Sequence, residues 1–338
     1  MNRDRFAAIA ERYRDLKIAV VGDFCLDRYL EIDPARAEVS IETGLTVHNV
    51  VRVRAQPGGA GTILNNLVAL GVGRIFAVGF CGEDGEGYEL KRGLAALPHV
   101  DLEHFVTTPL RRTFVYCKPL VLHAGKPPQE LSRLDSKNWS PTPAELQTEL
   151  ADRVRTLANQ VDAIILLEQV DEAETGVVCR PVTAAAREGS LRRPELLVLA
   201  DSRRGLGHFP QLGFKMNAAE LSKFSAAPED SLASIQAQVT HLAATNGRPV
   251  FVTLAERGIV GALPGLPAEH VPSHPVRGPI DIVGAGDSVT ANLTAALAAG
   301  ASLREAMELA MAAASIVIHQ LGTTGTASVS QLAELATA

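Results

Sequence analysis

The chain of 338 residues is 46% hydrophobic and 21% charged, which is ordinary for a globular protein with a substantial core. Its net charge of −6 argues against a surface that binds nucleic acid, and its four scattered cysteines suit a reducing compartment better than a disulfide framework or a zinc site. No apolar run is long enough to span a bilayer and the N-terminus does not resemble a signal peptide, so we expect a cytoplasmic protein without membrane contact.

Short, β-branched apolar runs alternate with helical patterns along the chain. The runs, of the kind buried on both faces of a parallel sheet, lie at residues 17–22, 75–80, 161–167, 196–200 and 250–254. The helical patterns lie at about 60–71, 86–97, 143–159, 171–188, 228–246, 286–300 and 302–320. This alternation predicts an α/β fold, with a doubly wound, mainly parallel sheet sandwiched by helices, in one domain over residues 1–338.

Two segments, at about residues 29–55 and 104–124, depart from this alternation. They contain stretches with alternating polar residues, such as VRVR at 51–54 and TFVYC at 113–117. Strands with one solvated face do not belong inside a buried parallel sheet. The two segments therefore favour a small separate sheet over the mouth of the main domain, although ordinary surface hairpins would show the same pattern.

Two aspartates and a glycine-rich run follow in the first part of the chain. Asp23 and Asp27 come after the first predicted strand, at the edge where open α/β sheets bind ligands, and a carboxylate there can accept bonds from two hydroxyls of a ligand. Aspartates that stabilise a turn would show the same spacing. In QPGGAGT, Gly58 and Gly59 let the backbone approach a ligand closely, and Thr62 can hydrogen-bond a hydroxyl.

Basic residues gather in and just beyond the second segment, at Arg111, Arg112, Lys118, Lys126 and Arg133. Such a cluster can bind a phosphate group on a substrate, and an arginine can do so through two parallel bonds. A solvated basic face explains any single one of these residues equally well.

The run DIVGAGDS at residues 281–288 directly precedes an alanine-rich helical pattern that stops at Gly300. Residues 284–286 can therefore place unpaired backbone N–H groups at a helix N-terminus, where the helix dipole also favours an anion. Asp287, at the same turn, can accept a proton from a hydroxyl nucleophile. An anion cradle beside a carboxylate base suits phosphoryl transfer to an alcohol, while a glycine turn with a capping aspartate is the alternative.

These motifs together resemble those of the ribokinase-like (PfkB) carbohydrate kinases, over about residues 17–326. The GAGD run, the glycine-rich run, the NAAE run at 217–220 and the VTLAERG run at 252–258 follow in the order of that family. The opening GDFCLDRY and the SRLD run at 132–135 resemble the bacterial D-glycero-D-manno-heptose-7-phosphate kinases in particular. Two positions depart from the pattern, because relatives often carry asparagine where Thr62 and Met311 stand.

The resemblance implies a role for each matching residue. Asp287 would be the catalytic base, with Gly284, Ala285 and Gly286 stabilising the transferred phosphoryl group. The acceptor sugar would contact Asp23, Asp27, Gly58, Gly59, Thr62, Arg133 and Glu168, the last at the end of the predicted strand IILLE. The nucleotide would contact Asn217, Thr253, Glu256, Gly258, Gly322 and Thr323, and Glu220 would act on Mg²⁺ through water. The NAAE spacing is equally that of an asparagine capping a helix.

The resemblance further implies ATP and Mg²⁺ as cofactors, a monovalent cation, and a small sheet that acts as a lid and joins two subunits into a homodimer. The expected reaction is transfer of the γ-phosphate of ATP to a sugar hydroxyl, such as O1 of a heptose 7-phosphate. A fructose-, ribose- or nucleoside-type kinase of the same family is the alternative, and a non-catalytic sugar-binding sensor is a third. We expect the nucleotidyltransferase domain that is fused to some heptose kinases to be absent from this chain.

Overall fold

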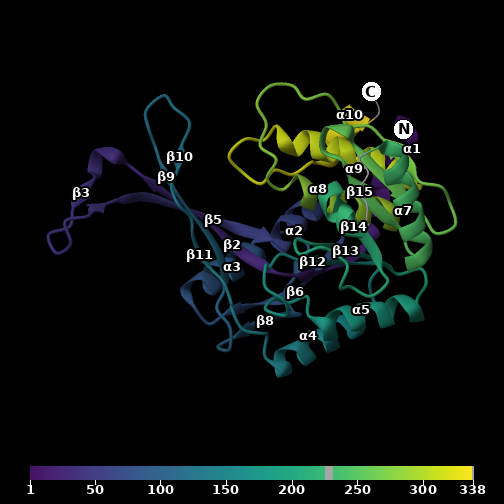
Figure 1. The fold of residues 1–338 in the computed structure, drawn as a ribbon, viewed down its shortest axis with the longest axis horizontal. Helices are drawn as coiled ribbons and strands as arrows, with labels where there is room; N and C mark the ends of the chain where they lie inside the picture. The colour runs from purple at the N-terminus through teal and green to yellow at the C-terminus, as the bar shows by residue number, and fades with distance from the viewer. Residues whose placement is uncertain (225–230, 337–338) are drawn as a thin grey trace.

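A ten-stranded sheet runs through the centre of the protein (Figure 1), in a computed structural model that describes residues 1–224 and 231–336. Its strands are β1 (Lys17–Gly22), β6 (Arg74–Gly82), β7 (Val100–Asp101), β8 (Phe105–Thr108), β12 (Ala163–Glu168), β13 (Leu197–Ser202), β14 (Gly213–Asn217), β15 (Val250–Thr253), β16 (Ile259–Ala262) and β17 (Glu269–Val271). The order is β17-β16-β15-β14-β13-β12-β1-β6-β7, with β8 also paired to β6. All neighbours from β15 to β7 are parallel, and only β16 and β17 continue the sheet antiparallel. The predicted doubly wound, mainly parallel sheet is therefore confirmed.

Helices cover both faces of this sheet, because successive side chains of a strand point to opposite sides. In β1, Ile18 and Val20 join the core beneath one helical layer, and Ala19 and Val21 join the core beneath the other. The first layer contains α1 (Arg3–Arg12), α2 (Ala60–Ala69), α8 (Ala285–Ala298), α9 (Leu303–Ile318) and α10 (Val329–Ala336), and the second contains α4 (Ala144–Leu157), α5 (Arg180–Arg192) and α7 (Leu232–Asn246). Burial on both sides explains why the strands read as continuous apolar runs.

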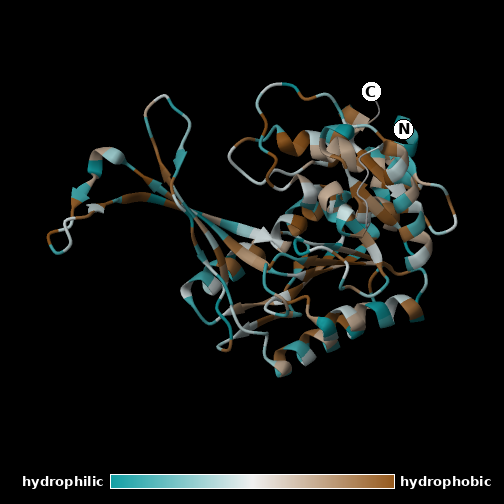
Figure 2. Cartoon of the chain, viewed as in Figure 1, coloured by the Kyte–Doolittle hydropathy of each residue, from teal (hydrophilic) through white to brown (hydrophobic). Residues whose placement is uncertain are grey.

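A second sheet of five strands projects from the main body as an arm (Figure 1). It consists of β2 (Phe24–Ile32), β5 (Val50–Gly59), β9 (Phe114–Val121), β10 (Gln129–Glu130) and β11 (Leu134–Ser136). In it, β2 pairs antiparallel with β5 and parallel with β9. A two-stranded hairpin, β3 (Glu38–Val39) and β4 (Thr46–Val47), lies at its far end. Figure 2 shows apolar stretches that continue along the arm, outside the core.

The small sheet differs in extent from the predicted segments, since β2 begins before residue 29 and β10 and β11 lie beyond residue 124. We predicted that the whole segment 104–124 belongs to it, but Phe105–Thr108 forms β8 and pairs with β6 of the main sheet. Its apolar residue Phe105 is buried and packs edge-on against Phe24, whereas the strand residues of the small sheet have a solvated face. Only residues 114–121 of that segment form a strand of the small sheet.

Several element boundaries also differ from the predictions. The helical pattern at 171–188 begins only at Arg180, because residues 171–179 form a loop and a proline occupies the first turn of α5. The helix predicted from 228 begins at Leu232 with Ser231 as its N-cap, and residues 228–230 lie outside the described part. The main-sheet strands β7, β14, β16 and β17 were not among the predicted apolar runs. The remaining short elements are α3 (Gly85–Ala95), α6 (Ala218–Leu221) and the 3₁₀ turns Tyr13–Asp15, Pro34–Arg36, Ser222–Phe224 and Ala255–Arg257.

No helix within the described residues is long and apolar enough to cross a membrane.

Candidate active site

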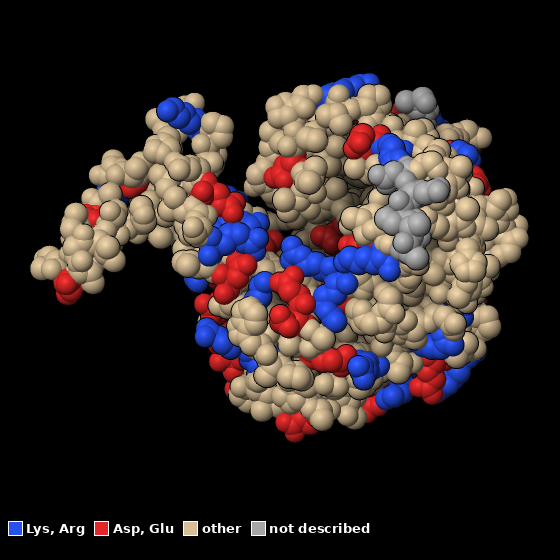
Figure 3. Space-filling model, viewed as in Figure 1, with Lys and Arg blue, Asp and Glu red and all other residues tan. Residues whose placement is uncertain are grey.

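Several of the predicted site residues lie near the point where the carboxyl ends of β13 and β14 meet the N-terminus of α8. The small sheet faces this point from one side. Figure 3 shows a hollow between the arm and the main body, with acidic side chains in its floor and lysine and arginine side chains along its rim. In open α/β sheets this end of the strands is where ligands bind.

The N-terminus of α8 has the backbone that an anion cradle needs. Gly284 is the N-cap residue with a left-handed φ of +83°, a conformation that strains any residue with a side chain. No side chain of the described residues caps this helix end. A Cβ at position 284 would also lie 2.8 Å from the Thr324 methyl group, so glycine is required here for space as well as for conformation. The uncapped N–H groups and the helix dipole both favour a bound anion at this end.

Asp287 lies in the first turn of the same helix and is surrounded by charged groups. Burial in the protein raises the pKa of its carboxyl to about 7, although part of the residue reaches solvent. The negative charges of Asp201 and Asp27 act in the same direction, and the positive charges of Lys215 and Arg203 oppose them. A carboxylate with a pKa near neutrality is suited to accept a proton from an alcohol.

A buried ion pair between Lys215 and Asp201 stabilises helix α8 through a hydrogen bond to Thr290. The Lys215 ammonium donates to Asp201 Oδ2 at 2.8 Å, and the Thr290 hydroxyl of α8 donates to the same oxygen at 2.9 Å. Burial alone would lower the pKa of Lys215, but the charge and hydrogen bond of Asp201 raise it. A Cβ on Gly286 would lie 3.1 Å from Lys215 Nζ, so this fixed positive charge lies directly beside the cradle.

Lys215 was not predicted from the sequence, and no role was predicted for Asp201 and Thr290. The available signal was a lysine in the middle of the apolar run GFKMN, which forms strand β14 with Lys215 only 6% exposed. A buried charge in a strand requires a partner, and such pairs are frequent at functional sites.

Asp23, predicted to bind sugar hydroxyls, has another role in the structure. Its carboxylate accepts backbone N–H bonds from Gln169 at 2.7 Å, Val170 at 3.2 Å and Val177 at 2.7 Å. The residue is 1% exposed, and burial raises its pKa to about 6 against the effect of these bonds. Its oxygens hold the loop that follows β12, so we correct the expectation that Asp23 contacts the acceptor.

Glu168, also predicted to bind the acceptor, is likewise saturated by protein groups. Its carboxylate accepts bonds from Arg204 at 2.8 Å and from the Ser202 hydroxyl, and His208 Nε2 lies 3.2 Å away. The side chain is 2% exposed. This carboxylate therefore neither reaches the hollow nor presents an unpaired charge to a substrate phosphate.

Asp27 and the glycine-rich run do come together. Asp27 lies within strand β2 of the small sheet and not in a turn at the carboxyl end of β1. It is directly opposite Gln56 of β5. A Cβ on Gly58 would collide with the Asp27 carboxylate, and Gly59 adopts a left-handed φ of +56° as the N-cap of α2. Thr62, in the first turn of α2, is buried. Like Thr324, it lies on the side of Gly284 toward which a Cβ would point. Burial raises the pKa of Asp27, whereas the charges of Lys118 and Arg133 lower it.

The basic residues do not form one cluster. Arg111 is 7% exposed and donates to the carbonyl oxygens of Ser140 at 2.8 Å and Thr175 at 2.9 Å, so it is a structural residue rather than a phosphate ligand. Arg112 and Lys126 are exposed, the latter in the loop between β9 and β10. Only Lys118 and Arg133 lie near Asp27. Lys118 stacks on the ring of Tyr29, and Arg133 stacks on Tyr116 while pairing with Asp135 at 2.9 Å.

On the other side of the cradle, Asn217 and Glu220 form a capping box at the start of α6. The Asn217 side chain accepts from the Glu220 N–H at 2.9 Å, and Glu220 Oε2 accepts from the Asn217 N–H at 2.8 Å. The alternative explanation of the NAAE spacing is thus realised. Burial raises the pKa of Glu220, and its charge acts on Lys215, so the carboxylate also lies close to the cradle.

The described residues fit a magnesium ion that is carried mainly by phosphates. They contain no group of three or more histidine, cysteine, aspartate or glutamate side chains that could hold a metal ion alone. Mg²⁺ commonly keeps several waters and needs only one or two carboxylates beside substrate phosphates. Glu220 can provide such a carboxylate through water.

The remaining predicted nucleotide residues lie at two neighbouring turns. Thr253 ends β15 and donates to the Met216 carbonyl at 3.3 Å, next to Asn217. Gly258 turns the chain from β15 into β16 with a φ of +93°, where a Cβ would collide with the Val271 carbonyl. Glu256 lies in that turn, and Gly322 and Thr323 lie in the loop that brings Thr324 against Gly284. Met311 is 5% exposed and belongs to the hydrophobic core.

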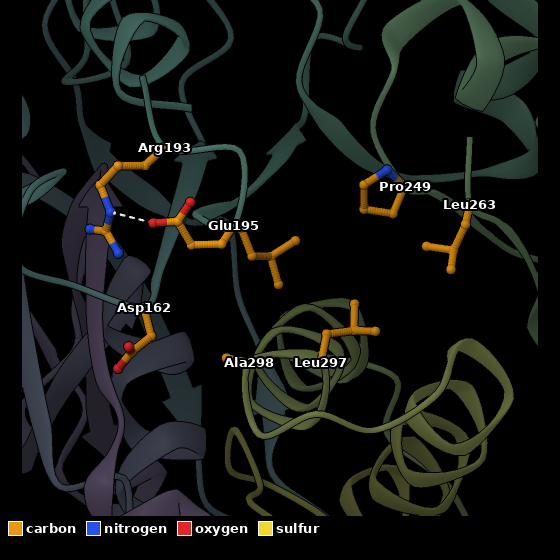
Figure 4. A pocket seen from close by; sticks show the side chains of 8 residues that line it. Asp162, Arg193, Glu195, Pro249, Leu263, Leu297 and Ala298 are labelled. Carbon is orange, nitrogen blue, oxygen red and sulfur yellow. Dashed lines mark hydrogen bonds and ion pairs between the residues drawn. The ribbon is translucent and has the colours of Figure 1, made fainter. Parts of the chain in front are cut away.

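A pocket at the opposite ends of the strands (Figure 4) is a poor candidate. It is lined by Asp162, Arg193, Glu195, Leu197, Pro249, Leu263, Leu297 and Ala298. Arg193 pairs with Glu195 at 2.9 Å and donates to two backbone carbonyls, and Asp162 accepts the Lys17 N–H at 2.8 Å. Its charged groups are therefore already satisfied by the protein.

Comparison with known proteins assigns this arrangement to a family. The model of the pfkB family carbohydrate kinases matches residues 15–329, and the chain belongs to that family. Its fold is ribokinase-like, as expected for a member of this carbohydrate kinase family. This membership favours an enzyme over the non-catalytic sugar sensor.

Curated relatives and solved structures agree with the assignment. The bifunctional protein HldE of Bradyrhizobium sp. (strain ORS 278) is 29% identical over 309 residues, which are 90% of this chain and 60% of the relative. HldE of Paramagnetospirillum magneticum (strain AMB-1) is 29% identical over 93% of this chain and 62% of its own length. This chain thus spans about 60% of the length of these relatives.

Among solved structures, Arabidopsis thaliana ribokinase with ribose and ATP superposes with a TM-score of 0.67 at 19% identity, covering 95% of this chain and 98% of that one. Phosphofructokinase-2 from Escherichia coli, in complex with substrates and products, gives 0.70 at 18% identity, with coverages of 95% and 98%. These likenesses establish the fold.

Proposed function

We propose that the protein transfers the γ-phosphate of ATP to a hydroxyl of a heptose 7-phosphate in the hollow between the two sheets. The observation that carries the proposal is Asp287 beside the uncapped cradle of Gly284–Gly286, with its pKa raised to about 7. Asp287 accepts the proton of the attacking hydroxyl as the new O–P bond forms and the bond to ADP breaks. The cradle N–H groups and Lys215 stabilise the negative charge on the transferred group, and the proton passes to solvent.

The nucleotide would bind over the turns that carry Thr253, Gly258 and Thr323, with Asn217 and Glu256 beside them. Mg²⁺, when bound, neutralises charge on the β- and γ-phosphates, and Glu220 would hold it through water. We also propose that a monovalent cation binds, because one similar structure is Escherichia coli phosphofructokinase-2 in complex with potassium.

The acceptor would lie against the small sheet, with ring hydroxyls on Asp27 and near the backbone of Gly58, Gly59 and Thr62. Its existing phosphate would face Lys118 and Arg133, the cations whose charges reach Asp27. Asp135, which pairs with Arg133, is 23% exposed, so a phosphate can replace it as the partner. Support for a heptose comes from the GDFCLDRY and SRLD runs, which resemble those of the heptose-7-phosphate kinases.

The acceptor is tested by comparing kcat/KM for heptose 7-phosphate with those for fructose, ribose and fructose 6-phosphate. We expect heptose 7-phosphate to be preferred by about 10-fold or more over the unphosphorylated sugars, because a charge-assisted bond is worth about 1.5–3 kcal/mol. Arg133→Met should remove most of this preference, whereas Arg112→Met, an exposed arginine outside the hollow, should keep it. A preference for ribose or fructose would contradict the heptose assignment and favour the alternative kinase specificities.

We further propose that the arm pairs two copies of the chain. β5 is an edge strand of the small sheet, and its Val51 and Val53 are 49% and 45% exposed on the face opposite Asp27 and Gln56. Further along the arm, Val39 and Leu45 are more than half exposed. An open edge with an apolar face invites pairing with another strand.

The pairing predicts a dimer in sedimentation velocity at micromolar concentration. Val53→Asp should shift the protein to a monomer, because it places a charge within the apolar contact. Arg52→Gln, on the other face of the same strand, serves as the matched control and should remain dimeric. A wild-type monomer at all accessible concentrations would exclude the arm as a dimer interface.

A further inference from the structure

One side-chain hydrogen bond joins the small sheet to the main body across the mouth of the hollow. The Gln56 amide of β5 donates to the Thr324 hydroxyl, a contact between residues 268 positions apart in the sequence. Both residues are partly buried. Gln56 and Thr324 thus connect the side of the hollow where we place the sugar with the loop where we place the nucleotide.

Gln56 lies next to the residue that we propose binds the acceptor. In the small sheet, Gln56 is directly opposite Asp27, and Asp27 in turn is opposite Tyr116 of β9. Directly paired residues of adjacent strands present their side chains on the same face. The residue proposed to hold sugar hydroxyls and the residue that reaches Thr324 are therefore immediate neighbours on the face that looks into the hollow.

Thr324 occupies a position from which it can act on the phosphate cradle. Its methyl group lies 2.8 Å from where a Cβ of Gly284 would be, so it packs directly on the N-cap of α8. The loop around it is held rigid by Gln320, whose amide donates to the Thr326 carbonyl at 2.7 Å and accepts the Thr326 N–H at 3.2 Å. A shift of Thr324 would therefore move the loop with it and change the packing against Gly284.

We propose that Gln56 and Thr324 are positioning residues, which transmit the position of the small sheet to the cradle at Gly284 and thereby couple sugar binding to nucleotide binding. The proposal rests on the proposed function for the identity of the two ligands, but not for the contact itself. Coupling of this kind is reciprocal: each ligand raises the affinity for the other by the same factor.

The contact is tested first in the protein without ligands, by hydrogen–deuterium exchange. Gln56→Ala and Thr324→Val should each speed amide exchange in residues 321–326 by roughly 2- to 10-fold, the effect of losing one hydrogen bond. The double variant should exchange no faster than either single one, because both remove the same bond. Thr324→Ser, which keeps the hydroxyl, should exchange like the wild type, and so should Arg52→Ala on the same strand. Unchanged exchange in both single variants would overturn the proposal.

The coupling is tested by calorimetry with Mg²⁺ and a non-hydrolysable ATP analogue, in the presence and absence of heptose 7-phosphate. The wild type should bind the analogue at least about 5-fold more tightly when the sugar phosphate is present, and Gln56→Ala and Thr324→Val should bring this ratio close to 1. A ratio that survives in both variants would overturn the coupling. If heptose 7-phosphate does not bind the wild type, the proposed acceptor fails, and the exchange experiment alone decides the positioning role.

Discussion

Replacement of Asp287 by asparagine should lower turnover by roughly 10²–10⁴-fold, the usual contribution of a general base. The amide keeps the shape of the side chain but cannot accept the proton of the attacking hydroxyl. Affinity for the ATP analogue should stay close to that of the wild type, because the cradle N–H groups and Lys215 are unchanged. Single-turnover kinetics together with calorimetry separate these two effects, and full activity in the variant would eliminate Asp287 as the base.

The same substitution should stabilise the protein at neutral and higher pH. Since burial and the neighbouring Asp201 raise the folded-state pKa of Asp287 to about 7, the folded chain retains a proton that the unfolded chain loses near pH 4. Stability therefore falls as pH rises between about 4 and 7, and the loss is complete above that range. Urea unfolding at pH 8 should show Asp287→Asn to be more stable than the wild type, with the difference vanishing near pH 4.

Lys215→Met should have the largest effect on stability. It leaves the Asp201 carboxylate, which is 12% exposed, without its cationic partner, and such a loss typically costs 3–5 kcal/mol. Arg304→Met is the matched control, because it breaks an ion pair to Glu269 on the surface that is worth about 1 kcal/mol or less. Urea unfolding at pH 7 compares the two, and equal losses would contradict the structural role of the buried pair.

Lys215→Met should also change how activity depends on pH. Asp287 is faced by Asp27, Asp201, Lys215 and Arg203, so removal of the lysine leaves two carboxylates against one arginine and raises the pKa of Asp287 further. The acid limb of the profile of kcat/KM against pH should then move to higher pH. The double variant Lys215→Met/Asp201→Asn removes both charges of the pair and should recover most of the lost stability. An unmoved acid limb would show that Lys215 does not act on the base.

The parts of the site that sequence alone predicted are those in which neighbours in the chain are also neighbours in space. The glycine turn, the cradle and Asp287 occupy one helix turn, so their chemistry can be inferred from the four consecutive residues 284–287. The parallel strands are predictable for a related reason, because burial on both faces leaves an apolar run.

The parts that could not be predicted depend on contacts between distant residues. The position of Asp23 after the first strand is typical of a residue that binds sugar hydroxyls. Its three partners, however, are backbone N–H groups about 150 residues later, which no local sequence pattern predicts. Arg111 belonged to a basic stretch by its sequence, yet carbonyl groups at positions 140 and 175 draw it into the interior. Lys215 finds its counter-charge on an adjacent strand, so its importance emerges only once the order of the strands is known.

The chain passes between the main body and the small sheet at four places: from β1 to β2, from β5 to α2, from β8 to β9 and from β11 to α4. No single continuous stretch of sequence contains the small sheet, so it cannot be exchanged between relatives as a cassette. A recombination event within it would pair strands from two parents and disturb their register. If the acceptor binds as proposed, a new specificity would arise by point substitutions on the inward face, at positions such as Asp27, Gln56 and Tyr116, while the main body remains the same.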